Sequence, residues 1–169
     1  MSKTVLLLIE NGHRDEEVIY PYYRFIEAGF NVEVVGPEKN KEYKGKFGLV
    51  LKSTLALEDV NIDEIEAVII PGGYAPDLMR LNKPMVKIVK DAFNSSKIIA
   101  SICHAAHMLV EADIIKGKNV TCWASLATDL INAGGNYLDQ EVVVDGNLVC
   151  SRMPDDLPAF CKATIDLIK

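Results

Sequence analysis

The sequence predicts an α/β protein whose central sheet is mostly parallel and carries helices on both faces. Three runs are almost continuously apolar, which is typical of strands buried on both faces: TVLLLI at 4–9, AVII at 67–70 and KIIASI at 97–102. Helical patterns of apolar residues alternate with these runs, and such alternation favours a parallel sheet. In sheets of this kind, active sites lie beyond the carboxyl ends of the strands.

The other elements are predicted from apolar spacing and from the residues that end each pattern. Gly29 ends the first helical pattern, and Pro21 within it predicts a kink or an irregular first turn. Pro84 suits the first turn of a later helix, and Asp145-Gly146 suits the turn of a hairpin. In chain order, the expected elements are a strand at 4–9, a helix at 15–28, a strand at 31–36, a hairpin-like excursion at 42–54, a strand with a glycine-rich end at 67–73, a helix at 82–93, a strand at 97–102, a helix at 104–112, a strand at 119–123, a helix at 127–133, a hairpin at 141–151 and a helix at 154–169.

Length and composition indicate an ordinary globular protein. The 169 residues suit one domain, so we expect a single domain over 1–169. A net charge of −6 and the lack of a Lys/Arg cluster argue against a nucleic-acid partner. The sequence shows no signal-peptide pattern and no apolar run long enough to span a bilayer. We therefore expect a cytoplasmic protein without a membrane partner.

The four cysteines, Cys103, Cys122, Cys150 and Cys161, are widely spaced and include no CxxC pair. This spacing favours neither a zinc ribbon nor a redox dithiol. In a reducing compartment the default is four free thiols, most of them packed as small hydrophobic groups. We expect no metal and no cofactor.

Cys103 is the cysteine whose surroundings favour reactivity. An apolar strand runs into it, a helix is expected after it, and the small residues Ser101 and Ala105 lie two positions to either side. This arrangement resembles a nucleophile elbow, in which a sharp strand-to-helix turn exposes the reactive atom. The amides at the start of the helix are expected to lower the pKa of the thiol. We therefore favour a reactive cysteine over one that only packs.

Two of the three histidines lie in the same stretch, SICHAAH. His104 is a candidate base or orienting group for Cys103, although neighbouring residues at an elbow point in different directions. A histidine in that role needs a third group to hold its ring. His107, one turn along, is expected to line the pocket or to pack. The set Cys103, His104 and His107 lacks a fourth ligand at a typical zinc spacing, so we do not expect a zinc site.

Two further strand ends carry candidate groups. Gly73, in the run PGG, lets the backbone approach closely, and the N–H groups of Gly73 and His104 are candidate oxyanion donors. A tight turn that needs positive φ would also explain the glycine. Asp15 and Glu16 suit the first turn of a helix. A buried Glu17 beside the cysteine would have a raised pKa and, protonated, would donate a hydrogen bond to sulfur.

With these residues assembled, the chain resembles the ThiJ/PfpI superfamily, which is similar to class I glutamine amidotransferases, and within it the PfpI intracellular-protease type. The stretches that carry the resemblance run in family order along nearly the whole chain: EVIYPYYRFIEAGFNVEVVG, AVIIPGGYAPDLMRLN, ASICHAAHML, DLINAGG and QEVVVDGNLVCSRMPDDLPAF. The resemblance implies a flavodoxin-like three-layer α/β sandwich with a nucleophile elbow.

The resemblance also implies roles for single residues. Cys103 matches the family nucleophile, and Glu17 matches the buried glutamate that contacts it. Gly73 and His104 match the oxyanion-binding amides, and His104 also matches the catalytic histidine. Asp77 matches an acidic residue that orients this histidine from a neighbouring subunit. The resemblance therefore implies a homo-oligomer, a dimer or a dimer-based hexamer, whose site is complete only at an interface.

Other positions bear on the choice of substrate. Trp123 matches a position that is aromatic in some relatives and lies near the site. The family commonly has a glycine-proline-glutamine run after the CH pair, whereas this chain has Ala105-Ala106-His107. The first loop is often an acidic FED-like run in relatives, and here it reads HRD. These departures leave the nucleophile in place and indicate a different substrate preference.

The resemblance leads to three functional hypotheses. The first is an intracellular cysteine peptidase that acts on small peptides through Cys103. The second is a cofactor-free glyoxalase III or protein deglycase that acts on α-oxoaldehydes such as methylglyoxal, with Glu17 and His104 moving protons. The third is a redox-responsive stress protein in which oxidants modify an acidified Cys103. A module with an inactive site is the remaining, least informative alternative.

Overall fold

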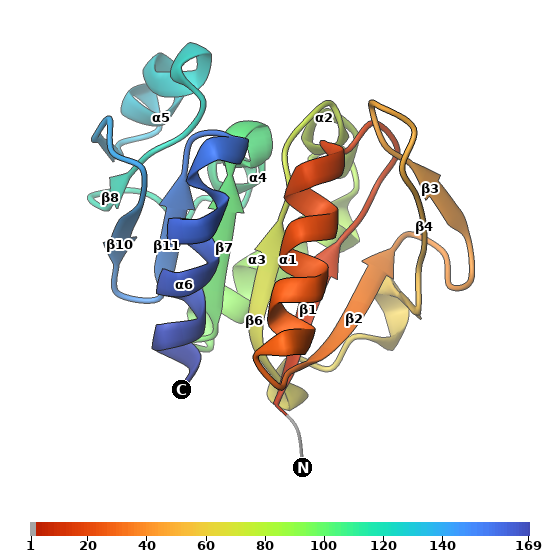
Figure 1. The fold of residues 1–169 in the computed structure, drawn as a ribbon. Coiled ribbons are helices and arrows are strands. Elements are labelled where there is room, and N and C mark those ends of the chain that lie inside the picture. Colours follow the sequence, from red (N-terminus) through yellow and green to blue (C-terminus); the bar gives the residue numbers. More distant parts are fainter. Residues whose placement is uncertain (1–2) are drawn as a thin grey trace.

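The computed structural model describes residues 3–169, and a seven-stranded sheet lies at its centre (Figure 1). The strands occur in the order β10-β11-β7-β6-β1-β2-β5, and every neighbouring pair is parallel except β10 with β11. Their bounds are β1 Thr4–Leu8, β2 Asn31–Gly36, β5 Leu55–Ala56, β6 Ile65–Ile70, β7 Ile98–Ile102, β10 Val143–Asp145 and β11 Leu148–Ser151. The sequence β2-β1-β6-β7-β11 is the strand order of flavodoxin-like sheets, which confirms the predicted fold class.

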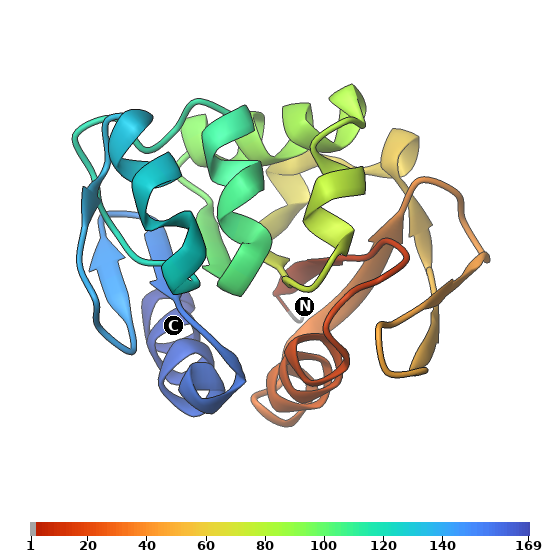
Figure 2. The same cartoon turned by 90° about the horizontal axis from the view of Figure 1, so that it is seen from above.

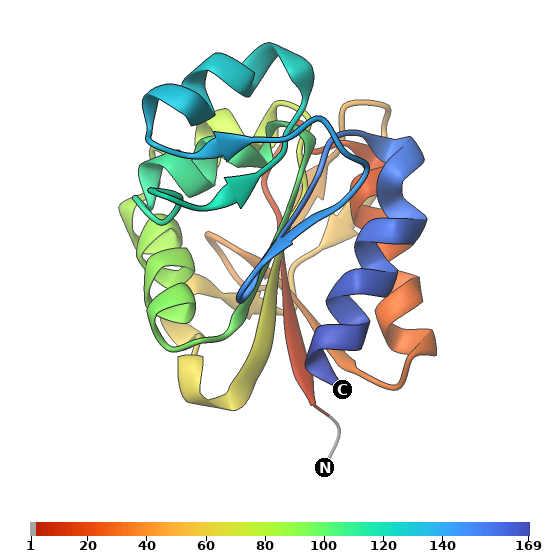
Figure 3. The ribbon, with the colours of Figure 1, turned by 90° about the vertical axis from the view of Figure 1, so that its left-hand side faces the viewer.

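Helices cover both faces of this sheet, as Figures 2 and 3 show. Helices α1 and α6 lie side by side on one face, and α2, α3, α4 and α5 lie on the other. The helix bounds are α1 Asp15–Glu27, α2 Ala75–Met79, α3 Lys83–Asn94, α4 Ala106–Glu111, α5 Ala127–Asn132 and α6 Leu157–Ile168. No helix within residues 3–169 combines the length and apolar character needed to cross a bilayer.

The continuous apolar strands serve two separate cores. Along β1, Val5 and Leu7 join the cluster beneath α1 and α6, while Leu6 and Leu8 join the cluster beneath the other helices. Successive side chains of a strand point to opposite faces, so a strand with a helix layer on each side must be apolar at every position. This explains why the run 4–9 shows no alternation.

Most predicted elements are present, with differences at their ends. The excursion at 42–54 is a hairpin of β3 Glu42–Lys44 and β4 Val50–Lys52, and β10 and β11 form the predicted second hairpin. The prediction of a strand at 119–123 is wrong in length. Only β8 Asn119–Val120 forms a strand there, and it pairs with β9 Asn136–Tyr137. The helix expected at 104–112 begins as a 3-10 turn, and α1 continues without interruption through Pro21.

Candidate active site

Three loops meet beyond the carboxyl ends of β1, β6 and β7. Backbone hydrogen bonds join the first two, because Arg14 N–H donates to Gly72 O at 3.1 Å and Tyr74 N–H donates to Gly12 O at 2.8 Å. Cys103 follows β7 directly. The switch point of the sheet, where the chain turns from β1 to β2 on one side and to β6 on the other, therefore brings together segments that are far apart in sequence.

Cys103 has the backbone conformation of a nucleophile elbow. Its φ is +63°, in the left-handed region that residues other than glycine rarely adopt. Such a conformation costs about 1–2 kcal/mol and persists where the surrounding structure enforces it. Ser101 and Ala105, which flank it at two positions, are both buried. The predicted strand–turn–helix setting of the cysteine is confirmed.

Glu17 lies buried next to this cysteine. Its Oε2 accepts a hydrogen bond from the backbone N–H of Gly72 at 2.7 Å, while its buried Oε1 has no hydrogen-bond partner within residues 3–169. Burial raises the pKa of Glu17 to about 7, against the opposing effects of Gly72 and Cys103. If Oε1 carries a proton, it can donate a hydrogen bond to the neighbouring sulfur of Cys103. The predicted direction of the Glu17 pKa shift is therefore correct.

The thiol of Cys103 does not have the lowered pKa that the sequence led us to expect. Burial raises its pKa to about 12, and the charge on ionised Glu17 acts in the same direction. The backbone N–H groups of His104 and Gly73 oppose this shift. The expectation was wrong because desolvation outweighs the amides of a short 3-10 turn. When Glu17 is protonated, its negative charge no longer raises the pKa of Cys103, so a thiolate forms more readily in that state.

His104 is a second titratable partner of the sulfur, beside Glu17. Its Nδ1 lies 3.3 Å from Cys103 Sγ, so the adjacent pair that sequence proximity did not guarantee is present. Burial lowers the pKa of His104, which keeps the ring neutral at pH 7 and able to accept a proton. The Trp123 ring stacks on it at 6.4 Å between centroids, and the backbone N–H of Trp123 donates to the backbone carbonyl of Cys103 at 3.3 Å.

Asp77 and His107 lie near His104: the rings of His104 and His107 are 6.2 Å apart between centroids, and both residues act on the pKa of His104. Asp77 Oδ1 is 3.6 Å from Nε2 of His107 in the same chain, and within residues 3–169 Asp77 has no ion pair with His104. The Asp77 side chain is 69% exposed, so it is accessible to another molecule. Its predicted role across an interface stays a prediction.

His107 is held by a different set of contacts. Arg80 donates to His107 Nδ1 at 3.0 Å, so the ring proton of a neutral His107 lies on Nε2, towards Asp77. His107 lines a separate cavity of about 320 Å³ with Arg80 and Asp129. It is absent from the lining of the cavity at Cys103, which was one of the two roles expected for it; the other was packing. Among residues 3–169, no three His, Cys, Asp or Glu side chains form a cluster suited to a metal ion.

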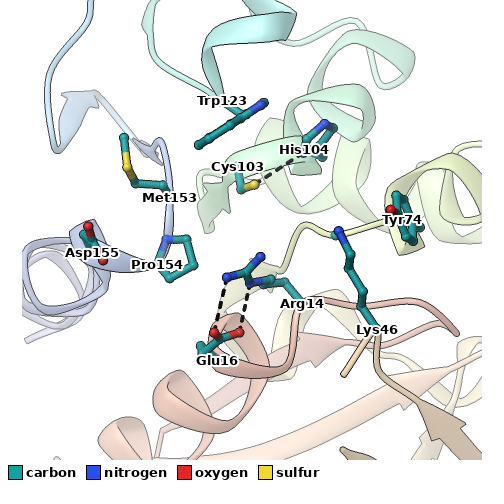
Figure 4. A pocket seen from close by; sticks show the side chains of 11 residues that line it. Arg14, Glu16, Lys46, Tyr74, Cys103, His104, Trp123, Met153, Pro154 and Asp155 are labelled. Carbon is teal, nitrogen blue, oxygen red and sulfur yellow. Dashed lines mark hydrogen bonds and ion pairs between the residues drawn. The ribbon is translucent and has the colours of Figure 1, made fainter. Parts of the chain in front are cut away.

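A cavity of about 560 Å³ opens over Cys103 and His104 (Figure 4). It is large enough for a small metabolite or a short peptide segment. Its lining comes from six parts of the chain: Arg14, Glu16, Lys46, Gly73, Tyr74, Cys103, His104, Trp123, Met153, Pro154 and Asp155.

A sequence profile of the DJ-1/PfpI family matches residues 3–167. The chain belongs to the DJ-1/PfpI family. Deglycase PfpI of Pyrococcus furiosus is 41% identical over 165 residues, covering 98% of this chain and 99% of that protein. A Bacillus subtilis protein named "Putative cysteine protease YraA" is 40% identical over 169 residues, covering all of both chains.

The solved structures show the same DJ-1/PfpI fold. A two-domain protein of Anabaena variabilis, which contains DJ-1/ThiJ/PfpI-like and ferritin-like domains, superposes with a TM-score of 0.97 at 40% identity. The match covers 99% of this chain and 48% of that protein, so the chain spans about half its length. The family resemblance inferred from the quoted motifs is thereby confirmed.

Several residues of this DJ-1/PfpI site were not predicted from the sequence. Gly72 donates to Glu17, and a Cβ at its position would lie 2.7 Å from Glu17 Oε2 and 2.8 Å from Cys103 Cβ. The PGG run was a signal for this close approach, although we assigned a role only to Gly73. Lys46 and Met153 reach the cavity from other loops, and no local motif marks either of them.

Proposed function

We propose that the protein is a cysteine-dependent enzyme that converts small α-oxoaldehydes without a cofactor, the chemistry of a glyoxalase or deglycase. The observation that carries this proposal is the buried carboxyl of Glu17, which has a pKa of about 7 beside Cys103. A group that exchanges its proton near the working pH is suited to act as both acid and base. Among the relatives, the protein of Pyrococcus furiosus is named a deglycase.

The proposed reaction begins when the Cys103 sulfur forms a bond to the aldehyde carbon. The thiol proton passes to neutral His104, whose Nδ1 lies 3.3 Å away, and the N–H groups of Gly73 and His104 hold the developing oxyanion. Ionised Glu17 then takes the proton from the aldehyde carbon, the first carbon, and returns it to the neighbouring carbonyl carbon, the second. Protonated His104 gives the former thiol proton to the oxygen on the second carbon. The first carbon is oxidised to a thioester as the second is reduced to an alcohol. Water finally breaks the S–C bond and releases a 2-hydroxy acid.

A peptidase, our first hypothesis from the sequence, becomes the second candidate. The short distance between His104 and Cys103 favours it, because a cysteine–histidine pair is the usual arrangement for acyl transfer. The relative from Bacillus subtilis bears a protease name. Acyl transfer, however, gives no task to a carboxyl that titrates near pH 7. The oxidant-sensing hypothesis is weakened by the buried thiol and its raised pKa.

The test is turnover of methylglyoxal, followed by NMR detection of lactate, with a fluorogenic short peptide assayed in parallel. Cys103→Ala should remove lactate formation, and Glu17→Gln should reduce it by about 100-fold or more because the substitution removes a proton-transfer group. Cys161→Ala, in α6 and away from the cavity, is the matched control and should retain activity. Lactate formation no faster than in Cys103→Ala would refute the proposal, and peptide cleavage alone would establish the peptidase instead.

A further inference from the structure

The cavity at Cys103 contains four charged side chains, and two of them neutralise each other. Arg14 forms two hydrogen bonds to Glu16, from Nε to Oε2 at 2.9 Å and from Nη2 to Oε1 at 3.3 Å (Figure 4). The guanidinium of Arg14 is therefore already occupied by a carboxylate. Asp155 lies on the opposite wall of the cavity from Lys46, as Figure 4 shows.

Lys46 is the remaining cation, and it has no acidic partner within 4.0 Å in the part of the chain that the structure describes. Its Nζ lies 4.4 Å from the centroid of the Tyr74 ring and 5.5 Å from that of Phe47. Aromatic faces hold an ammonium group in place without neutralising its charge. Lys46 therefore presents a positive charge at the cavity that no carboxylate compensates.

The loop that carries Lys46 is fixed in position by the residues that precede and open α1. The backbone N–H of Lys46 donates to His13 O at 2.8 Å. The carboxylate of Asp15 accepts the N–H groups of Phe47 at 3.0 Å and of Leu49 at 2.6 Å. The ammonium is thus presented from an ordered loop rather than from a free hairpin tip.

The charge of Lys46 also acts on His104, one member of the reacting pair. It contributes to the lowering of the His104 pKa, and the charge of Cys103 in turn acts on Arg14. A substrate bound with its carbonyl at the sulfur would therefore have Lys46 within electrostatic reach. An anionic group on the substrate would replace the missing acidic partner.

We propose that Lys46 binds a carboxylate of the substrate, so that the enzyme prefers α-oxoaldehydes carrying a carboxylate over neutral ones. This inference rests on the proposed function for its choice of substrate class. An ammonium–carboxylate contact in a partly enclosed site is a charge-assisted hydrogen bond, and its loss lowers affinity by about tenfold or more. The cavity volume of about 560 Å³ accommodates a five-carbon chain.

The first test does not depend on turnover. Iodoacetate and iodoacetamide both alkylate Cys103 and have nearly the same size, but only iodoacetate is an anion. The rate constant for iodoacetate divided by that for iodoacetamide, both followed by mass spectrometry at Cys103, should fall by about tenfold in Lys46→Met. Lys52→Met, on the same hairpin but outside the cavity, is the matched control and should leave the ratio unchanged. Taking the ratio cancels any change in the reactivity of the thiol itself.

The second test uses turnover of two five-carbon substrates. The wild-type kcat/KM for 4,5-dioxopentanoate, which carries a carboxylate, should exceed that for neutral 2-oxopentanal and should fall as salt is added. Lys46→Met should lower kcat/KM for 4,5-dioxopentanoate by about tenfold relative to that for 2-oxopentanal, which removes the preference. Conversion of both substrates without any preference would overturn the Lys46 inference alone. If neither substrate is converted, the proposed function fails, while an unchanged alkylation ratio in Lys46→Met would separately overturn the anion site.

Discussion

At the scale of single residues, the site depends on the protonation of two buried neighbours, Glu17 and Cys103. Burial raises the pKa of Glu17 to about 7 and that of Cys103 to about 12, and each anion disfavours the other. The N–H of Gly72 fixes one oxygen of Glu17, which leaves the other for the sulfur. The protonation of this pair therefore links the stability of the fold to the reactivity of the thiol.

Glu17 should make the protein less stable as the pH rises. Between pH 4.5, its ordinary pKa, and about 7, the folded state holds a proton that the unfolded state has lost. The free energy of unfolding then falls by at most about 1.4 kcal/mol per pH unit, or about 3 kcal/mol in all. The stabilising contribution is complete below pH 4.5 and lost as pH rises through 7. Urea unfolding across pH 4.5–8 measures it.

Glu17→Gln keeps the shape of the side chain and cannot titrate. Its unfolding free energy should therefore lack this component, so the difference between the wild type and the variant should change steadily over the same pH range. Subtracting the two curves cancels the titration of the other carboxyl groups. A difference that is constant with pH would contradict the raised pKa of Glu17.

At the scale of the elements, the turn between β6 and α2 is the tightest part of the site. Gly73 has a φ of +79°, and a Cβ there would lie 2.5 Å from both Arg14 N and Gly12 O. Real Cβ atoms do not approach backbone so closely, so the β1–α1 loop would have to move. Glycine at this position therefore lets two strand ends meet.

Gly73→Ala should destabilise the protein by about 2–4 kcal/mol, since it combines left-handed strain with a backbone clash. It should also lower activity, because the loop that carries Arg14 borders the cavity. Gly117→Ala is the matched control: φ is +74°, but nothing lies within 4 Å of the added Cβ, so only about 1–2 kcal/mol of strain is expected. Thermal unfolding of both variants provides the comparison, and equal losses of stability would argue against the clash.

At the scale of the whole molecule, the site opens on a surface that is partly apolar. In α2, which carries Asp77, and close beside it in the chain, the residues Tyr74, Leu78 and Leu81 are 61%, 48% and 78% exposed. Large apolar groups gathered on one surface are typical of sites that bind another protein molecule. This arrangement is consistent with the predicted homo-oligomer, in which Asp77 would approach His104 of a second copy.

Mixing inactive variants tests whether Asp77 acts across an interface. Asp77→Asn and Cys103→Ala should each lose activity as pure proteins. After refolding together as dimers, half of the assemblies are hybrids with one intact site in two, so about a quarter of the wild-type activity should return. Size-exclusion chromatography checks that hybrids form. No recovery in verified hybrids would place Asp77 with the His104 of its own chain, and full activity of pure Asp77→Asn would remove its predicted role.

The sequence by itself determined the class of fold and the candidate nucleophile. Apolar runs such as that of 97–102 predict strands covered on both faces, because every position of such a strand is buried and must be apolar. Cys103 could be identified for the same local reason, since an elbow needs small residues at fixed offsets. Its direct neighbour His104 and the glycine-rich end of β6 were visible in the same way.

Only the tertiary structure decided the electrostatics and the lining of the cavity. The raised pKa of Cys103 results from desolvation by distant segments and from Glu17, which is 86 residues away in sequence. Lys46 reaches the cavity from the turn of the β3–β4 hairpin, and His107 lines a separate cavity. Burial, charge and shape at a site depend on which segments the fold brings together. A local sequence pattern predicts the structure of its own segment. Which other segments contact it is decided by the packing of the whole chain.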